Sequence, residues 1–66
     1  MNIILNNQLE KIPETYTVKN LLADKNIKTK YFAVEINRNI VPKSTYCKYY
    51  LKENDKVEII TAIGGG

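Results

Sequence analysis

Short runs of alternating hydrophobic and polar positions dominate the first part of this chain. Residues 1–5 are largely aliphatic, and residues 8–12 alternate in the way that suits a strand with one buried face. Asn6 and Asn7 lie between the two runs, and asparagine tolerates the positive φ angles of a tight hairpin turn. Pro13 follows the second run, where it ends the strand. The pattern therefore predicts a β-hairpin at the start of the chain.

A helical pattern comes next, at residues 18–25. Apolar residues recur there at the i, i+3, i+4 spacing, beginning at Val18, and form one stripe on a short helix. Thr17 is a suitable N-cap. Asn26 is a suitable stop, and Ile27 offers a hydrophobic contact just after it. We expect a single amphipathic helix in this region.

The second half of the chain again favours strands. Its predicted strands are residues 31–36, a brief strand at 40–41, and 57–62. Between the last two, residues 43–50 are predicted to be irregular, with one helical turn.

This order of elements is that of a β-grasp, an α+β fold in which a mixed sheet of four to five strands clasps one helix. In that topology the first and last strands lie side by side and parallel at the centre of the sheet. A ferredoxin-like fold would need a second helix, and residues 41–51 are too interrupted to form one. We expect one domain at residues 1–63, followed by a flexible tail at 64–66.

The tail holds the only three glycines of the chain, Gly64, Gly65 and Gly66. Glycine is normally used inside a domain where a turn needs a positive φ angle, so its restriction to the tail is informative. A tail without Cβ atoms is narrow and flexible, and it ends in a carboxylate. Those properties suit an end group that threads into the active site of another enzyme. A frayed chain end is the alternative.

Composition excludes several kinds of chemistry. The chain has 66 residues, 44% of them hydrophobic, which indicates one folded domain without a membrane span or secretion signal, and hence a cytoplasmic protein. Histidine is absent, so we expect neither a metal site nor a catalytic triad, and the chain is not predicted to be an enzyme. Cys47 is the only cysteine, and we expect it to be a small buried hydrophobic side chain.

The net charge of +3 raises the question of an anionic partner. Most lysines are spread along the chain and mixed with acidic residues, and only Lys25, Lys28 and Lys30 form a loose basic group. This pattern indicates a solvated surface. We therefore expect no nucleic acid or membrane partner, and a monomer when the protein is free.

Four stretches carry a resemblance to a known family along the whole chain. They are AVEIN at 33–37, IVPK at 40–43, ENDKVEI at 53–59 and the terminal Gly65-Gly66. On these residues the chain resembles the ThiS family, the ubiquitin-like sulfur carrier proteins of thiamine biosynthesis. Asn20 stands where the family usually has glutamate, which we expect to weaken a capping box. Tyr46 stands where the family usually has tryptophan.

The resemblance implies a mechanism centred on Gly66. An E1-like adenylating enzyme, using ATP and Mg²⁺, would convert the Gly66 carboxylate to an acyl-adenylate. Sulfur from a donor such as a cysteine desulfurase would then give a thiocarboxylate, and thiazole synthase would take the sulfur. Gly64 and Gly65 would lie in a channel too narrow for side chains. The carrier itself would bind no cofactor.

A docking surface is predicted on the side of the sheet away from the helix. If Ile3 and Val57 point at the helix, strand alternation sends Ile4 and Ile60 to the opposite face, with Ile63 at the root of the tail. Large aliphatic side chains on an open face favour a partner that covers them. The alternatives are scattered exposure, or core positions if the register is shifted by one residue.

Three other functions remain open at this point. The small subunit of molybdopterin synthase shares the fold, the Gly-Gly end and the thiocarboxylate. A ubiquitin-like modifier would use the same tail to form an isopeptide bond with lysine. A nucleic-acid-binding β-grasp domain would not need the terminal glycines, so truncation of the tail separates it from the others.

Overall fold

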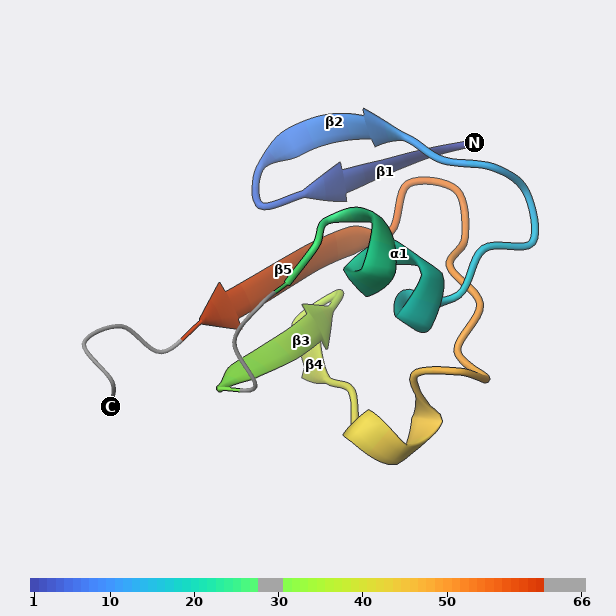
Figure 1. The fold of residues 1–66 in the computed structure, drawn as a ribbon. Helices are drawn as coiled ribbons and strands as arrows, with labels where there is room; N and C mark the ends of the chain where they lie inside the picture. Colours follow the sequence, from blue (N-terminus) through green and yellow to red (C-terminus); the bar gives the residue numbers. More distant parts are fainter. Residues whose placement is uncertain (28–30, 62–66) are drawn as a thin grey trace.

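The computed structural model describes residues 1–27 and 31–61. In chain order its elements are β1 (Asn2–Leu5), β2 (Gln8–Lys11), α1 (Val18–Asp24), β3 (Phe32–Ile36), β4 (Asn39–Ile40), the 3₁₀ turn η1 (Lys43–Thr45) and β5 (Lys56–Thr61). The strands form one five-stranded sheet in the order β2-β1-β5-β3-β4, and α1 lies across one side of it (Figure 1). β1 and β5 are parallel neighbours, whereas the other pairs are antiparallel. This topology confirms the predicted β-grasp.

The first hairpin turns where the two asparagines predicted it. Asn6 and Asn7 have φ angles of 48° and 68°, which is the left-handed conformation that asparagine tolerates better than most residues. The Asn6 side chain also reaches across the sheet, because its Oδ1 accepts a hydrogen bond of 2.9 Å from the backbone N–H of Ile59 in β5. The turn therefore helps to hold the last strand.

The helix begins with a complete capping box. Thr17 Oγ1 accepts a hydrogen bond of 3.1 Å from the Asn20 N–H, and Asn20 Oδ1 accepts one of 3.0 Å from the Thr17 N–H. The box therefore forms with asparagine at position 20, because its amide oxygen reaches the Thr17 N–H. The expectation that asparagine makes the box weaker than glutamate would stays a prediction.

The helix ends in a Schellman motif. Asn26 has a φ angle of 55°, and its N–H donates to the Ala23 carbonyl, while the Ile27 N–H donates to the Leu22 carbonyl. The predicted stop at Asn26 is confirmed. Among the described residues α1 is the only α-helix, and its seven residues cover one side of the sheet, so the other side has no α-helix over it.

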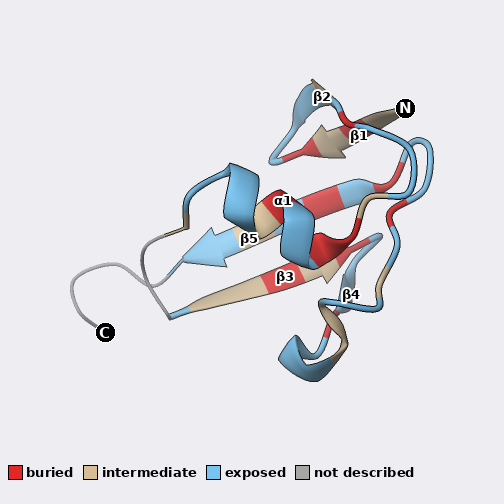
Figure 2. Cartoon of the chain, turned by 45° about the vertical axis from the view of Figure 1, so that its right-hand side comes forward, coloured by how far each residue is buried: buried red, intermediate tan, exposed pale blue. Residues whose placement is uncertain are grey.

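The core lies between α1 and the inner side of the sheet. Its buried side chains are Ile3, Leu5, Ile12, Val18, Leu21, Val34, Ile36, Val41, Leu51 and Val57. Each fully buried aliphatic side chain contributes roughly 1.5–3 kcal/mol of transfer free energy. Figure 2 shows the buried residues concentrated on β1, β3 and β5 where they face the helix. Because strands alternate, burial of these positions fixes which side chains point outward.

Candidate functional site

The last strand, β5, is held by a neighbouring strand on each side. It pairs with β3 from Phe32↔Thr61 to Ile36↔Val57. On its other edge the N–H of Ile4 donates to the backbone carbonyl of Asp55, and the N–H of Asn6 donates to the backbone carbonyl of Val57, each at 2.9 Å. The bonds on this edge reach as far as Ile59, whose N–H donates to Asn6 Oδ1, whereas among the described residues Ile60 and Thr61 pair with β3 alone. The described chain therefore ends in a strand that is paired with β3 up to Thr61.

Asp55 fixes the start of β5 through its buried carboxylate. Oδ1 accepts a hydrogen bond of 3.0 Å from Asn37 Nδ2, and Oδ2 accepts one of 2.8 Å from the Lys52 N–H. Asn37 in turn accepts from the Lys56 N–H at 3.0 Å. Asp55 is only 7% exposed, so these hydrogen bonds replace water around the charge. The turn before β5 is thus tied to the turn after β3.

The predicted tail residues lie outside the described residues. This applies to Ile63, Gly64, Gly65 and Gly66, and also to Lys28 and Lys30 of the loose basic group. The described chain ends at Thr61, at the tip of β5 (Figure 1).

The side of the sheet opposite to α1, which we call the open face, gathers exposed aliphatic residues. Strand register places these residues on it: Asn2, Ile4, Leu9, Lys11, Ala33, Glu35, Ile40, Lys56, Glu58 and Ile60. Ile60 is 48% exposed and Ile4 is half-buried, and both point away from the core as expected. The alternative of a register shifted by one residue is excluded by the burial of Ile3 and Val57.

Two further aliphatic residues belong to the open face. Leu9 lies opposite Ile4 in β2, and Ile40 lies opposite Glu35 in β4; they are 73% and 63% exposed. Neither residue was predicted to lie on the open face. The sequence of residues 8–12 predicts a strand but does not show which side of the sheet Leu9 faces, and the pairing with Ile4 in β1 shows that its side chain points outward. Ile40 lies on an edge strand of two residues, which is too short to show alternation.

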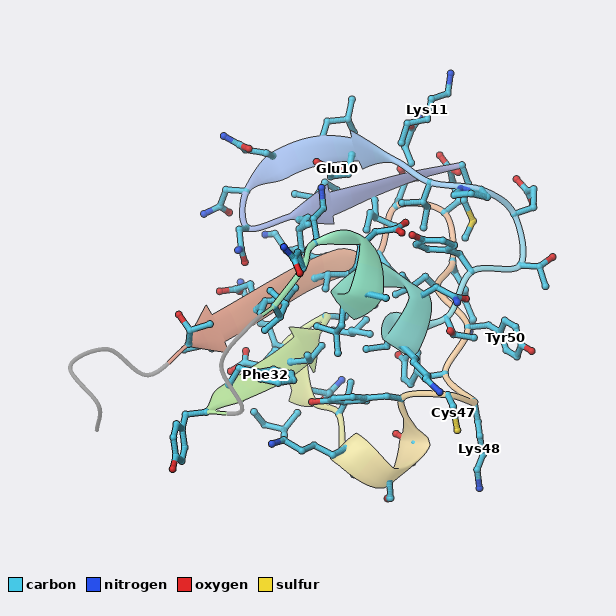
Figure 3. The ribbon with its side chains drawn as sticks, in the orientation of Figure 1. Glu10, Lys11, Phe32, Cys47, Lys48 and Tyr50 are labelled. Carbon is cyan, nitrogen blue, oxygen red and sulfur yellow. The ribbon has the colours of Figure 1, made fainter. Side chains whose placement is uncertain are left out.

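Cys47 is exposed, so the expectation that it is buried was wrong. The backbone around it is tied to the start of α1, because the N–H groups of Val18 and Lys19 donate to the carbonyls of Tyr49 and Tyr46. These bonds orient the segment so that the thiol points outward. In Figure 3 Cys47 and its neighbour Lys48 project away from the domain, on the side opposite to the tip of β5.

A surface pocket of about 380 Å³ lies beside Cys47, lined by Lys48, Tyr49, Tyr50 and Lys52. It contains no acid, no histidine and no second nucleophile. In Figure 3 Tyr50, like Lys48, points outward on the side of the molecule away from the tip of β5. We therefore place the candidate site at the end of β5 and on the open face, rather than at this pocket.

Tyr46, which stands where the family usually has tryptophan, packs against Phe32. Its ring stacks on Phe32 with 6.3 Å between the centroids, and the ammonium group of Lys43 lies 4.9 Å from the Phe32 ring centre. Burial raises the pKa of the Tyr46 phenol above its usual value. Because Phe32 pairs with Thr61, this aromatic cluster supports the tip of β5 from the side of the helix.

Residues 1–27 and 31–61 contain no group of three or more potential metal ligands. The same residues include no helix long and apolar enough to cross a membrane.

Comparison with known proteins identifies the family. The ThiS family model matches residues 3–66, which is nearly the whole chain. The chain belongs to the ThiS family. The sulfur carrier protein ThiS of Bacillus subtilis is 36% identical over 53 residues, which are 80% of each chain. A thiazole synthase of Paramagnetospirillum magneticum is 36% identical over all 66 residues of this chain, which make up 20% of that protein. The chain thus spans about a fifth of the length of that relative.

A solved structure agrees with this family. The crystal structure of the thiamine biosynthesis protein ThiS from Geobacter metallireducens superimposes with a TM-score of 0.85, covers the whole of both chains and is 26% identical in sequence. The resemblance to the ThiS family and the β-grasp fold are therefore confirmed.

Proposed function

We propose that this protein carries sulfur for thiamine biosynthesis on the carboxylate of Gly66. The observation that carries the proposal is the glycine run Gly64–Gly66, which is separated from the end of β5 by two residues in the sequence, in a chain of the ThiS family. β5 is paired with β3 along its length and with β1 at its start. This strand supplies a defined starting point for the tail. Gly64 and Gly65 supply a segment without Cβ atoms that can enter a narrow channel.

The chemistry requires an adenylating partner. A carboxylate is a poor electrophile until one oxygen becomes part of a good leaving group. Attack of the Gly66 carboxylate on the α-phosphate of ATP gives an acyl-adenylate and releases pyrophosphate, and the partner enzyme binds the Mg²⁺ that neutralises the phosphates. A hydrosulfide nucleophile then forms the C–S bond while AMP leaves with the electrons of the broken C–O bond. The carrier is a substrate in both steps and binds no cofactor. A cysteine desulfurase is the proposed source of the sulfur. Its cysteine persulfide releases hydrosulfide when thiols reduce it, and those thiols are oxidised to a disulfide.

The proposed recipient of the sulfur is thiazole synthase. In the relative from Paramagnetospirillum magneticum, a protein named thiazole synthase contains a segment that matches this whole chain. A second relative of that name, from Magnetococcus marinus, shows the same arrangement at 33% identity. Joining of two activities in one polypeptide favours their direct contact. The arrangement in these two relatives supports direct contact between this protein and a separate thiazole synthase.

The open face is the proposed docking surface for these partners. Ile4 in β1 and Ile60 in β5 both lie on it, with Ile4 beside Lys56, four residues before Ile60. Leu9 and Ile40 extend the aliphatic area to both edges of the sheet. A partner that covers this face would place its active site near the end of β5, since the tail leaves from the same sheet. Ile63 is proposed to complete the contact at the root of the tail.

The test is the intact mass of the protein after incubation with ATP, a sulfide source and the adenylating enzyme of the same organism. The untreated protein should first show the mass of residues 1–66, so that Gly66 is the free end. The treated protein should gain roughly 16 Da, the difference between sulfur and oxygen, within the C-terminal peptide. Deletion of Gly66, or addition of one residue after it, should abolish the gain without unfolding the domain. A sulfur adduct on Cys47 in place of the C-terminal change would overturn the proposal.

A further inference from the structure

Two glutamates face each other at the centre of the open face. Glu35 in β3 and Glu58 in β5 are direct partners in the antiparallel pairing, so their side chains leave the sheet on the same side. Directly opposite residues have Cβ atoms about 4.5–5.5 Å apart, and like charges at that spacing destabilise a sheet. The pairing of β3 and β5 thus contains a repulsive pair of like charges.

No cation in the described part of the chain forms an ion pair with either carboxylate. The carboxylates that do form ion pairs there belong to Glu10, which contacts Lys25 at 2.9 Å, and Glu14, which contacts the amino terminus at 3.7 Å. Lys56 lies on the open face two residues before Glu58, yet no ion pair joins them. Within residues 1–27 and 31–61 the repulsion between Glu35 and Glu58 is therefore not offset by a direct ion pair.

Aliphatic side chains lie beside the two carboxylates, although Lys56 precedes Glu58 on the same face of β5. Ile40 lies directly opposite Glu35 on one side, and Ile60 follows Glu58 on the same face of β5, opposite Ala33. A partner that covers Ile40 and Ile60 must also remove water from the glutamates between them. An ionised carboxylate without water or a partner is costly to bury, so covering this face demands a counter-charge.

We propose that the partner covering the open face inserts an arginine between Glu35 and Glu58, surrounded by apolar groups that contact Ile40 and Ile60. The planar guanidinium has five N–H donors and can bond two carboxylates at once. This inference rests on the proposed function, in which a protein partner covers the open face, and it specifies the chemistry of that partner. The two strands keep an unfavourable pair that becomes favourable only in the complex, which is the kind of local conflict expected at a functional surface.

The net charge of the whole domain and the charge at the centre of the open face have opposite signs. The chain has ten basic and seven acidic residues, so its overall field favours acidic partners. A basic group at the centre of the interface is instead selected locally, by contact with the glutamate pair. Charge arrangements of this kind contribute to specificity more than to affinity.

The first measurement is the stability of the free domain. Glu58→Gln removes the repulsion without changing side-chain size, so the thermal midpoint should rise by about 2–4 °C for a domain of this length. Glu35→Gln is the matched variant for stability, because it removes the same repulsion from the other strand and should raise the midpoint by a similar amount, while the double variant Glu35→Gln/Glu58→Gln should add little further. Asp24→Asn, which removes one charge from an exposed position on α1, serves as the control for binding. An unchanged or lower midpoint for Glu58→Gln would overturn the inference. So would an equal rise when millimolar Mg²⁺ is added to the native protein, because the pair would then be a site for a free cation.

The second measurement is binding to the adenylating enzyme and to thiazole synthase of the same organism, by titration calorimetry at low salt. Glu58→Gln should weaken binding to at least one of them by about tenfold, because one charge-assisted hydrogen bond is lost. Glu58→Lys places an ammonium group opposite Glu35 and should weaken binding further, while the free domain remains at least as stable as the native one. Asp24→Asn should bind within about twofold of native.

The outcomes separate this inference from the proposed function. Native binding together with unchanged binding of Glu58→Gln and Glu58→Lys overturns the arginine contact alone. Failure of the native protein to bind either enzyme overturns the proposed function and this inference with it. A rise in stability combined with a loss of binding supports the inference, because a residue with a purely structural role would not move the two quantities in opposite directions.

Discussion

Substitution of Ile60 gives the sharpest test of the docking surface. Full burial of an isoleucine side chain is worth roughly 1.5–3 kcal/mol. Ile60 is 48% exposed in the free domain, so a partner that covers it gains about half of that amount. Ile60→Ala should therefore weaken binding of the adenylating enzyme by about 1 kcal/mol, or some fivefold. Ile60→Asp adds the desolvation of a carboxylate and should cost about 2–4 kcal/mol, or at least 30-fold.

The assay measures the affinity of each variant by titration calorimetry and its folding by far-UV circular dichroism and thermal melting. The fold should survive both substitutions because the Ile60 side chain lies outside the core, and strand propensity changes stability by at most about 1 kcal/mol. Ile4→Asp, on the neighbouring strand, should behave like Ile60→Asp. Tyr50→Ala is the control, since Tyr50 is 53% exposed but lies in the segment away from the open face, and its loss should leave binding unchanged.

Two results would refute this reasoning about Ile60. Normal binding by folded Ile4→Asp and Ile60→Asp variants would show that the docking surface lies elsewhere. Unfolding of either variant would show that its side chain belongs to the core.

Two further predictions concern stability and the thiol. Asp55→Ala removes two hydrogen bonds to a buried carboxylate and leaves the donors on Asn37 and Lys52 without that partner, so the free energy of unfolding in urea should fall by about 2–4 kcal/mol; a loss below about 0.5 kcal/mol would show that water replaces the carboxylate. Cys47→Ser should change stability little, because the thiol is exposed, and should leave thiocarboxylate formation intact. Complete loss of sulfur transfer in the folded Cys47→Ser protein would show that the thiol takes part.

Local signals in the sequence predicted most of the fold. The paired asparagines at the first turn, the cap at Thr17 and the stop at Asn26 each depend on neighbouring atoms, and all three appear as expected. Strand alternation also assigned Ile60 to the exposed side correctly, because Val57 in the same strand is strongly apolar and must be buried. Features set within a few residues were thus accessible from the sequence.

Features that depend on distant pairings were not accessible. The exposure of Leu9 follows from its pairing with Ile4, and the position of Ile40 follows from its pairing with Glu35. The repulsive contact between Glu35 and Glu58 requires the register of two strands, and the two residues are 23 positions apart in the sequence (58 − 35). The outward direction of Cys47 depends on hydrogen bonds to the start of α1, in a segment without periodicity.

In the proposed function, docking on the open face and sulfur chemistry at Gly66 are separable, and both depend on the hydrogen bonds of Asp55. Its hydrogen bonds fix the start of β5, and that strand carries both Ile60 of the open face and the connection to the glycine tail. A substitution that removes the hydrogen bonds of Asp55 would therefore disturb partner binding and thiocarboxylate formation together, so it could not separate the two roles. Ile60 and Gly66 lie beyond this anchor, so changes there affect one role each. A variant that docks without carrying sulfur, and one that keeps Gly66 but does not dock, would show that the sheet selects the partner while the tail holds the sulfur.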